Sequence, residues 1–306
     1  MSFPDRCDIC PRACLADRRT GSGFCGCGDK IILNRVSVHK WEEPCVSGRR
    51  GSAAFFFGGC SLGCVYCQNS AISRSPVGKE FSVQEFSDLL LKAAGSGCET
   101  INLVTPTHFT PQVCEALSMV RGRISVPVVW NSGGYELTET LKLTEGLVDV
   151  YMPDFKYSDG ELAGRLSNAP DYPEIAREAI GFMLSLRPKA EYGEDGILRR
   201  GVIVRHLCLP GYRENSLGVL RELDALRVRG EPLLSLMAQY TPDFYSGDDK
   251  NLRRRITTFE YKKIADEAAS LGFEGFTQDV TSARATYTPP FGEEFADETD
   301  DKRNKK

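Results

Sequence analysis

The chain has no apolar run that approaches the roughly 18 residues needed to span a membrane. Its first residues, 1–8, contain no hydrophobic signal core. It also has no basic excess, because 38 Lys and Arg residues stand against 42 Asp and Glu residues, for a formal net charge of −4. Non-specific nucleic-acid binders carry such an excess. We therefore expect a cytoplasmic protein with neither a membrane nor a nucleic acid as its partner.

The composition is otherwise that of an ordinary globular protein. Of 306 residues, 41% are hydrophobic and 26% are charged, which argues against wholesale disorder. Cysteine is the exception, because there are 12 and most lie before residue 68. In a cytosolic chain of this size, clustered cysteines bind metal or carry out redox chemistry more often than they form a disulfide scaffold.

From residue 53 onward, short apolar runs alternate with longer segments of helical spacing. The runs, each typical of a strand buried on both faces of a parallel sheet, cover residues 53–59, 100–105, 126–131, 148–153, 201–207 and 233–239. Helices are expected over 86–94, 113–120, 172–186, 216–228 and 259–271, the first after a capping box at Ser82 and Glu85. Six such units predict an α/β fold, either a partial barrel or a doubly wound sheet.

Polar side chains occur at or just after the end of every one of these predicted strands, where parallel α/β folds place their sites. They are Cys60, Thr105 and His108, Asn131 and Ser132, Asp154 and Lys156, Arg205 and His206, and Gln239. Any one of them alone is as easily a paired structural group, and Asp154 with Lys156 as easily a strand-end ion pair. Together they predict one polar site, in which Lys156 and Arg205 would suit a carboxylate-bearing ligand.

Three cysteines directly after the first strand form the sharpest motif. Cys60, Cys64 and Cys67 have the spacing C-x3-C-x2-C, and nearby glycines let the backbone fold tightly around a bound group. Thiolates bind iron–sulfur clusters and zinc, and three ligands leave one position of a cubane cluster open, as in catalytic metal sites. A zinc site with a distant fourth ligand and a fragment of a ferredoxin remain alternatives.

This triplet, with Tyr66 as its aromatic residue, resembles the signature of the radical S-adenosylmethionine (SAM) superfamily. Further segments resemble its uncharacterised branch related to the pyruvate formate-lyase activating enzyme, over most of the chain from Cys7 to Gln278; they are residues 41–44, 55–69, 103–108, 131–136, 151–157, 202–212 and 235–242. The resemblance implies a partial (β/α)6 barrel preceded by a Cys-rich irregular segment. It also implies a 4Fe–4S cluster on Cys60, Cys64 and Cys67.

The resemblance further implies an enzyme that cleaves SAM reductively to a 5′-deoxyadenosyl radical, which takes hydrogen from a substrate. Tyr66 would lie against the adenine, and the remaining SAM-pocket residues would be Asn131, Ser132, Asp154, Lys156 and Arg205. The electron would come from an external donor such as flavodoxin or ferredoxin. The chain departs from the superfamily after the second strand, where Gly-Gly-Glu is replaced by Thr105-Pro106-Thr107, so the group that holds the SAM amine is not assigned.

A second cysteine group precedes the barrel. Cys7, Cys10, Cys14 and Cys25 could close a tetrahedral zinc site or hold a second iron–sulfur cluster, with Cys27 as a spare. Free buried cysteines are the alternative. Cys114 and Cys208 fall in helix and strand patterns and are expected in the core, and Cys45 is left open. The adjacent Glu42 and Glu43 fit either an acid–base pair or a solvated turn.

These patterns divide the chain into a Cys-rich metal-binding segment (1–50), a radical SAM partial barrel (51–290) and a charged, disordered tail (291–306). The expected function is a radical SAM oxidoreductase. Its substrate is either a partner protein, as for a glycyl-radical activase, or a small molecule or peptide, because fold and cofactor do not fix substrate. The alternative is a non-catalytic iron–sulfur electron-transfer protein, which would not need polar groups at all six strand ends.

Overall fold

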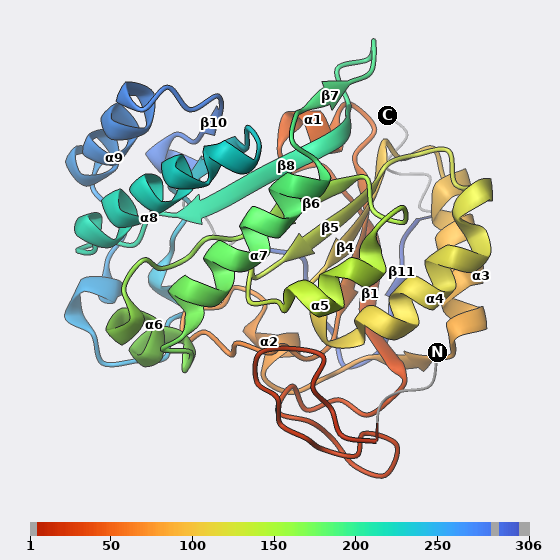
Figure 1. Ribbon diagram of the computed structural model, residues 1–306. Coiled ribbons are helices and arrows are strands. Elements are labelled where there is room, and N and C mark those ends of the chain that lie inside the picture. The colour runs from red at the N-terminus through yellow and green to blue at the C-terminus, as the bar shows by residue number, and fades with distance from the viewer. Residues whose placement is uncertain (1–4, 283–287, 300–306) are drawn as a thin grey trace.

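The computed structural model describes residues 5–282 and 288–299, in which helices cover one face of a mostly parallel sheet (Figure 1). The strand order is β10-β9-β8-β6-β5-β4-β2-β1-β11, with β3 paired to β1 and β7 paired to β8. The strands are β1 (Ile31–His39), β2 (Ser52–Phe57), β3 (Lys79–Phe81), β4 (Thr100–Val104), β5 (Val128–Ser132), β6 (Val150–Pro153), β7 (Glu191–Tyr192), β8 (Leu198–Leu207), β9 (Leu233–Met237), β10 (Gly275–Thr277) and β11 (Ala296–Asp297).

The strand order distinguishes the two predicted architectures. From β2 to β10 the parallel strands stand side by side in chain order. Only β3 and β7, which pair antiparallel with β1 and β8, lie outside this order. A doubly wound sheet would reverse its order at a switch point. The sheet therefore winds in one direction as a barrel does, and within the described ranges it remains open between β10 and β11. All six predicted strands are present, and the partial-barrel fold is confirmed.

The predicted helices are also present. The helices are α1 (Pro44–Ser47), α2 (Ser70–Ser73), α3 (Val83–Gly95), α4 (Thr110–Val120), α5 (Thr138–Leu141), α6 (Gly160–Ser167), α7 (Tyr172–Leu186), α8 (Arg213–Leu226) and α9 (Thr258–Ser270). The capping box forms as expected, since Ser82 Oγ accepts from the Glu85 amide at 3.2 Å and the Ser82 amide donates to Glu85 Oε2 at 2.8 Å. Satisfying these amides fixes the start of α3.

Side chains that alternate along the strands fill separate clusters on the two faces of the sheet. Trp130 and Tyr151 belong to the main cluster under the helices, whereas their neighbours Val129, Val150 and Met152 belong to a second cluster. Because successive strand residues point to opposite faces, the second cluster lies on the inner face of the sheet. Helix α1 joins this inner cluster through Cys45 and Val46. The whole length of β2, β4, β5, β6 and β9 is buried, as a two-sided parallel sheet requires.

The Cys-rich segment is less irregular than expected. Its last part forms β1, which pairs antiparallel with β2 and carries a register shift between Leu33 and Arg35. The run 31–39 is rich in β-branched residues, but Asn34 and Arg35 interrupt its pattern although both are buried against the C-terminal segment. Only the part before β1 is an irregular coil, and it lies at the end of the molecule near α2 (Figure 1).

The C-terminal part also differs from the expectation. A seventh parallel strand, β10, adds to β9, and its three residues are too few for a periodic signal. In the predicted tail, Phe291 packs on Phe56, Phe295 packs on Phe81, and β11 pairs with β1. These aromatic contacts order residues 291–299 despite their charge. Residues 300–306 of the predicted tail lie outside the described residues.

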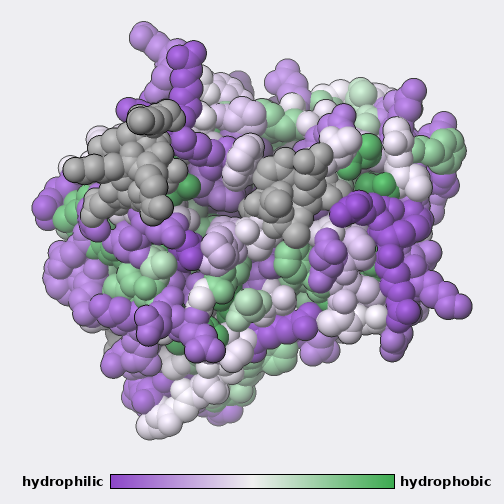
Figure 2. All heavy atoms as spheres, turned by 180° about the vertical axis from the view of Figure 1, so that it is seen from behind, coloured by the Kyte–Doolittle hydropathy of each residue, from purple (hydrophilic) through white to green (hydrophobic). Residues whose placement is uncertain are grey.

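The molecular surface is mostly hydrophilic on the face turned away from the helices, where hydrophobic side chains occur in small separate groups (Figure 2). Among the described residues, no helix combines the length and the apolar character that crossing a bilayer requires.

The main core predicts a large cost for one truncation in α3. Phe86 is fully buried, with ring centroids 5.8 Å from those of both Phe55 and Phe57. Phe86→Ala should lower the free energy of unfolding by about 3–5 kcal/mol through lost burial and the cavity it leaves. The matched control Phe259→Ala, at a position 67% exposed, should change it by less than about 0.5 kcal/mol. Urea denaturation measures both, and equal effects would contradict the assigned core.

Candidate active site

A cavity of about 380 Å³ lies at the carboxyl ends of the parallel strands. Side chains that follow β2, β4, β5, β6, β8 and β9 all line it, as the polar strand ends predict. It contains every residue that the sequence placed at the cluster and the SAM pocket: Cys60, Cys64, Tyr66, Cys67, Asn131, Ser132, Asp154, Lys156 and Arg205. Six separate strand ends are thus brought to one site, although their individual roles stay predictions.

The three cysteines sit on a loop between β2 and α2. The loop turns sharply at Gly59 and Gly63, whose φ angles of 82° and 72° lie in the left-handed region that favours glycine. Burial raises the pKa of each thiol, so each would be a neutral thiol unless a bound metal stabilised its thiolate. This donor set of three thiols at one cavity fits an iron–sulfur cluster.

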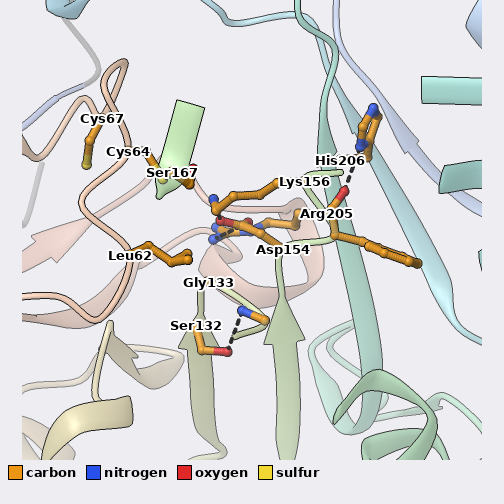
Figure 3. Close-up of polar contacts among 12 residues, drawn as sticks. Leu62, Cys64, Cys67, Ser132, Gly133, Asp154, Lys156, Ser167, Arg205 and His206 are labelled. Carbon is orange, nitrogen blue, oxygen red and sulfur yellow. Dashed lines mark hydrogen bonds and ion pairs between the residues drawn. The ribbon is translucent and has the colours of Figure 1, made fainter. Parts of the chain in front are cut away.

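A partly buried ion-pair network faces the cysteines across the cavity (Figure 3). Asp154 accepts from Lys156 Nζ at 2.5 Å and from Arg205 Nε at 3.0 Å. Burial alone would raise the pKa of Asp154, but Arg205 and Lys156 hold it below its usual value. Burial likewise opposes the charge of Lys156, yet the Asp154 carboxylate raises the pKa of this ammonium. All three groups are therefore charged near neutral pH.

Arg205 extends this network to two further elements. Its Nη2 donates to Asn131 Oδ1 on β5 at 2.6 Å, and its Nη1 lies 3.4 Å from Glu42 Oε2. Glu42 also accepts from Asn102 Nδ2 at 2.9 Å, and burial raises its pKa. Glu42 is thus a cavity residue and not part of a solvated turn. No periodicity marks residues 40–43, and only the two adjacent carboxylates could have pointed to it.

The segment after β4 departs from the superfamily motif and has unusual backbone geometry. Thr105 lines the cavity with a φ of 64°, rare for a β-branched residue. Its amide donates to the Asn131 carbonyl at 2.7 Å. Below it, the buried carboxylate of Glu136 accepts from Ser132, Trp130 and Thr107. Glu136 thereby ties the β4 and β5 ends together, a role that no sequence pattern indicates.

The two histidines near strand ends point away from the cavity. His108 Nε2 bonds the Gly58 carbonyl at 2.8 Å. His206 lies between the Phe155 carbonyl and Ser216 Oγ, at 2.7 and 2.8 Å. Neither lines the cavity, so both act as structural polar groups.

The N-terminal cysteines Cys7, Cys10, Cys14 and Cys25 do not line the cavity. Cys7, Cys10 and Cys25 are buried and Cys14 is exposed, whereas the sequence placed all four at a second site. Among the described residues, no group of three or more His, Cys, Asp or Glu side chains is arranged to hold a metal ion, and this applies to Cys60, Cys64 and Cys67 as well as to the N-terminal cysteines. Both metal sites therefore stay predictions. Cys45, Cys98, Cys114 and Cys208 are buried, free thiols.

Comparison with known proteins agrees with this picture. Residues 46–161 match the family model of a 4Fe-4S single cluster domain. The uncharacterized protein MJ0674 of Methanocaldococcus jannaschii is 27% identical over 271 residues, which cover 86% of this chain and 74% of the relative.

Two solved structures share parts of the arrangement. SuiB of Streptococcus suis, solved with its precursor peptide SuiA, has a TM-score of 0.50 at 11% identity, covering 76% of this chain and 51% of SuiB. The chain thus spans about half the length of SuiB, and the likeness concerns the fold. A domain of pyruvate-formate lyase-activating enzyme from Bacteroides vulgatus has a TM-score of 0.40 at 12% identity, covering 56% of this chain and 91% of the domain.

The family match agrees with the predicted 4Fe–4S cluster. The shared fold agrees with the predicted partial barrel, and the binding of SAM stays a prediction.

The shared carboxylate predicts a strong effect of Asp154→Asn. The substitution leaves Lys156 and Arg205 buried without their common anion, so the free energy of unfolding should fall by about 3 kcal/mol. The control Asp195→Asn removes a more exposed pair with Arg199 and should lower the free energy of unfolding far less, because solvent screens the pair. Urea denaturation at pH 7 compares the two variants. An Asp154→Asn protein with an unchanged free energy of unfolding would argue against the charged network.

Burial of His206 predicts a pH dependence of stability. Burial lowers the pKa of His206 from 6.5 to about 4, and Asp154 and Lys156 are the charged groups that act on it. The unfolded chain therefore binds the proton first, and stability is lost as the pH falls from 6.5 towards 4, by up to about 3 kcal/mol. His206→Gln should remove this part of the slope. Unfolding curves between pH 4 and 7 test it, and parallel profiles for both proteins would refute it.

Proposed function

We propose that this chain is a radical SAM enzyme. The observation that carries the proposal is that one cavity joins the three motif cysteines to the partly buried Lys156–Asp154–Arg205 network. An iron–sulfur electron carrier needs the cysteines but gains nothing from a polar cavity of this volume beside them. A cavity that accepts a small charged molecule next to a cluster is what cofactor cleavage requires.

The cysteines would hold the cluster. Cys60, Cys64 and Cys67 supply three thiolates, and Gly59 and Gly63 let the loop wrap around the bound group. When bound, the cluster and SAM supply the one-electron cleavage chemistry. The chain's own part is to bind these groups, orient them and keep water away.

Lys156 is the group best suited to bind a ligand carboxylate or hydroxyl. An ammonium has three donors, and one of those on Lys156 serves Asp154. Arg205 already directs its donors to Asp154, Asn131 and Glu42. Arg205 would therefore act by orienting Asn131 for a ribose contact, whereas Lys156 contacts the ligand directly.

Tyr66 would provide the adenine contact. It lines the cavity beside the cysteines, and its ring centroid lies 6.2 Å from that of Tyr240 in an edge-to-face arrangement. Two aromatic rings at one wall would give the adenine an apolar surface.

Substrate and electron donor would reach the site from outside. Trp41 lines the cavity and is 66% exposed, so the cavity reaches the surface there. We propose an external one-electron donor such as flavodoxin or ferredoxin. The substrate would be a partner protein, as in glycyl-radical activation, or a small molecule that enters beside Trp41.

Reductive cleavage of SAM tests the proposal. Anaerobically purified, iron-reconstituted protein would be given dithionite and SAM, and 5′-deoxyadenosine would be measured. Wild type should release it slowly, and Cys60→Ala, Cys64→Ala and Cys67→Ala should each abolish the release, because each removes a cluster ligand. Cys208→Ala is the matched control, since Cys208 is buried and lies outside the cavity lining.

The outcomes separate enzyme from electron carrier. A 4Fe–4S signal in the wild type whose EPR spectrum does not respond to SAM, together with no cleavage, would favour the carrier. Release that persists in the three cysteine variants would contradict the assigned ligands. An EPR response to SAM without cleavage would still support SAM binding, and candidate partner proteins would then be added as substrate.

A further inference from the structure

Three buried hydroxyl groups form a chain that ends on the sulfur of Cys64. Tyr66 Oη lies 2.7 Å from Tyr157 Oη, which lies 2.7 Å from Ser167 Oγ. Ser167 Oγ in turn lies 2.9 Å from Cys64 Sγ, and the two residues stand together in Figure 3. Ser167 is 1% exposed and Tyr157 is fully buried, so the chain is shielded from solvent.

The direction of this chain is fixed once Cys64 is a metal-bound thiolate. A thiolate sulfur has no proton and can only accept, so Ser167 must donate its single hydroxyl proton to it. Tyr157 must then donate to Ser167, and Tyr66 must donate to Tyr157. Each donor polarises the next, which strengthens the last bond in a low-dielectric interior.

Arg12 of the N-terminal coil holds Ser167 in place. Its guanidinium donates to the Ser61 and Leu62 carbonyls of the cluster loop, at 2.6 and 3.3 Å. It also donates to the Ser167 carbonyl at 3.1 Å and to the Asn168 carbonyl, both at the end of α6. The last carbonyls of a helix lack intrahelical partners and carry partial negative charge, so an arginine there is doubly favoured.

We propose that Ser167 is a positioning residue that raises the reduction potential of the cluster held by Cys64, and that Arg12 fixes it there. The inference rests on the proposed function, since it requires a cluster on Cys60, Cys64 and Cys67. Reduction adds negative charge to the cluster and its sulfurs. A hydrogen bond to a ligand sulfur therefore stabilises the reduced state, and this is one of the factors that set the potential of iron–sulfur sites.

The potential is measured on the reconstituted holoprotein without SAM, by a redox titration followed by EPR. Ser167→Ala should keep the iron content of the wild type and shift the midpoint potential to a more negative value. Ser167→Thr keeps the hydroxyl and should restore the wild-type potential. Tyr157→Phe removes the donor to Ser167 and should give a smaller shift in the same direction.

Ser73→Ala is the matched control near another ligand. Ser73 Oγ lies 3.5 Å from Cys67 Sγ, a much longer contact than that of Ser167, so its loss should move the potential less. Arg12→Lys keeps the charge but not the four-carbonyl fork, and should shift the potential in the direction of Ser167→Ala.

Two results would overturn the inference. One is a Ser167→Ala protein with a full cluster and an unchanged potential. If that variant cannot hold iron, Tyr157→Phe decides, and a full cluster at the wild-type potential in that variant is the second overturning result. Either result in a protein that still cleaves SAM leaves the proposed function standing. A wild type with a normal cluster and no response to SAM overturns the proposed function, while the comparison of potentials still tests Ser167.

Discussion

Two partly buried cations, Lys156 and Arg205, share the carboxylate of Asp154. The backbone brings them together, since Asp154 and Arg205 face one another across β6 and β8, and the Phe155 amide donates to the Arg205 carbonyl at 2.8 Å. From this pair, hydrogen bonds lead to Asn131 on β5 and to Glu42 in the cavity wall. Charged groups out of water are stable only when paired and hydrogen-bonded. Strand register, charge balance and cavity shape are therefore coupled at this one carboxylate.

Much of the fold could be predicted because its signals are local. Five strands buried on both faces, and the mostly buried β8, read as apolar runs, and the helices between them show their caps and periodicity. β1 could not be read this way, because Asn34 and Arg35 interrupt its apolar pattern and find their partners in the distant C-terminal segment. β10 and β11 are too short to carry a period and exist only through pairing with β9 and β1.

The candidate site divides in the same way. Cys60, Cys64 and Cys67 are close in sequence and form a motif, and Asp154, Lys156 and Arg205 follow recognisable strands. Glu42, Arg12 and Ser167 act through contacts between segments far apart in the chain. Only the adjacent Glu43 draws attention to Glu42, and no local pattern signals Arg12 or Ser167. Arg12 and Ser167, for example, are separated by 155 positions and meet only because α6 ends beside the cluster loop.

Gly59, which precedes Cys60, shows how closely the N-terminal coil packs against the barrel. A Cβ on Gly59 would lie 2.4 Å from Cys27 Sγ and 2.6 Å from the Cys25 carbonyl, at a φ of 82° that already disfavours a side chain. Cys27 itself rests on the Gly58 carbonyl. A larger side chain in one segment therefore fits at this contact only if the other segment has a smaller one. We therefore expect the two segments to change together during evolution, and a coil transplanted from another barrel to need its own matching cluster loop.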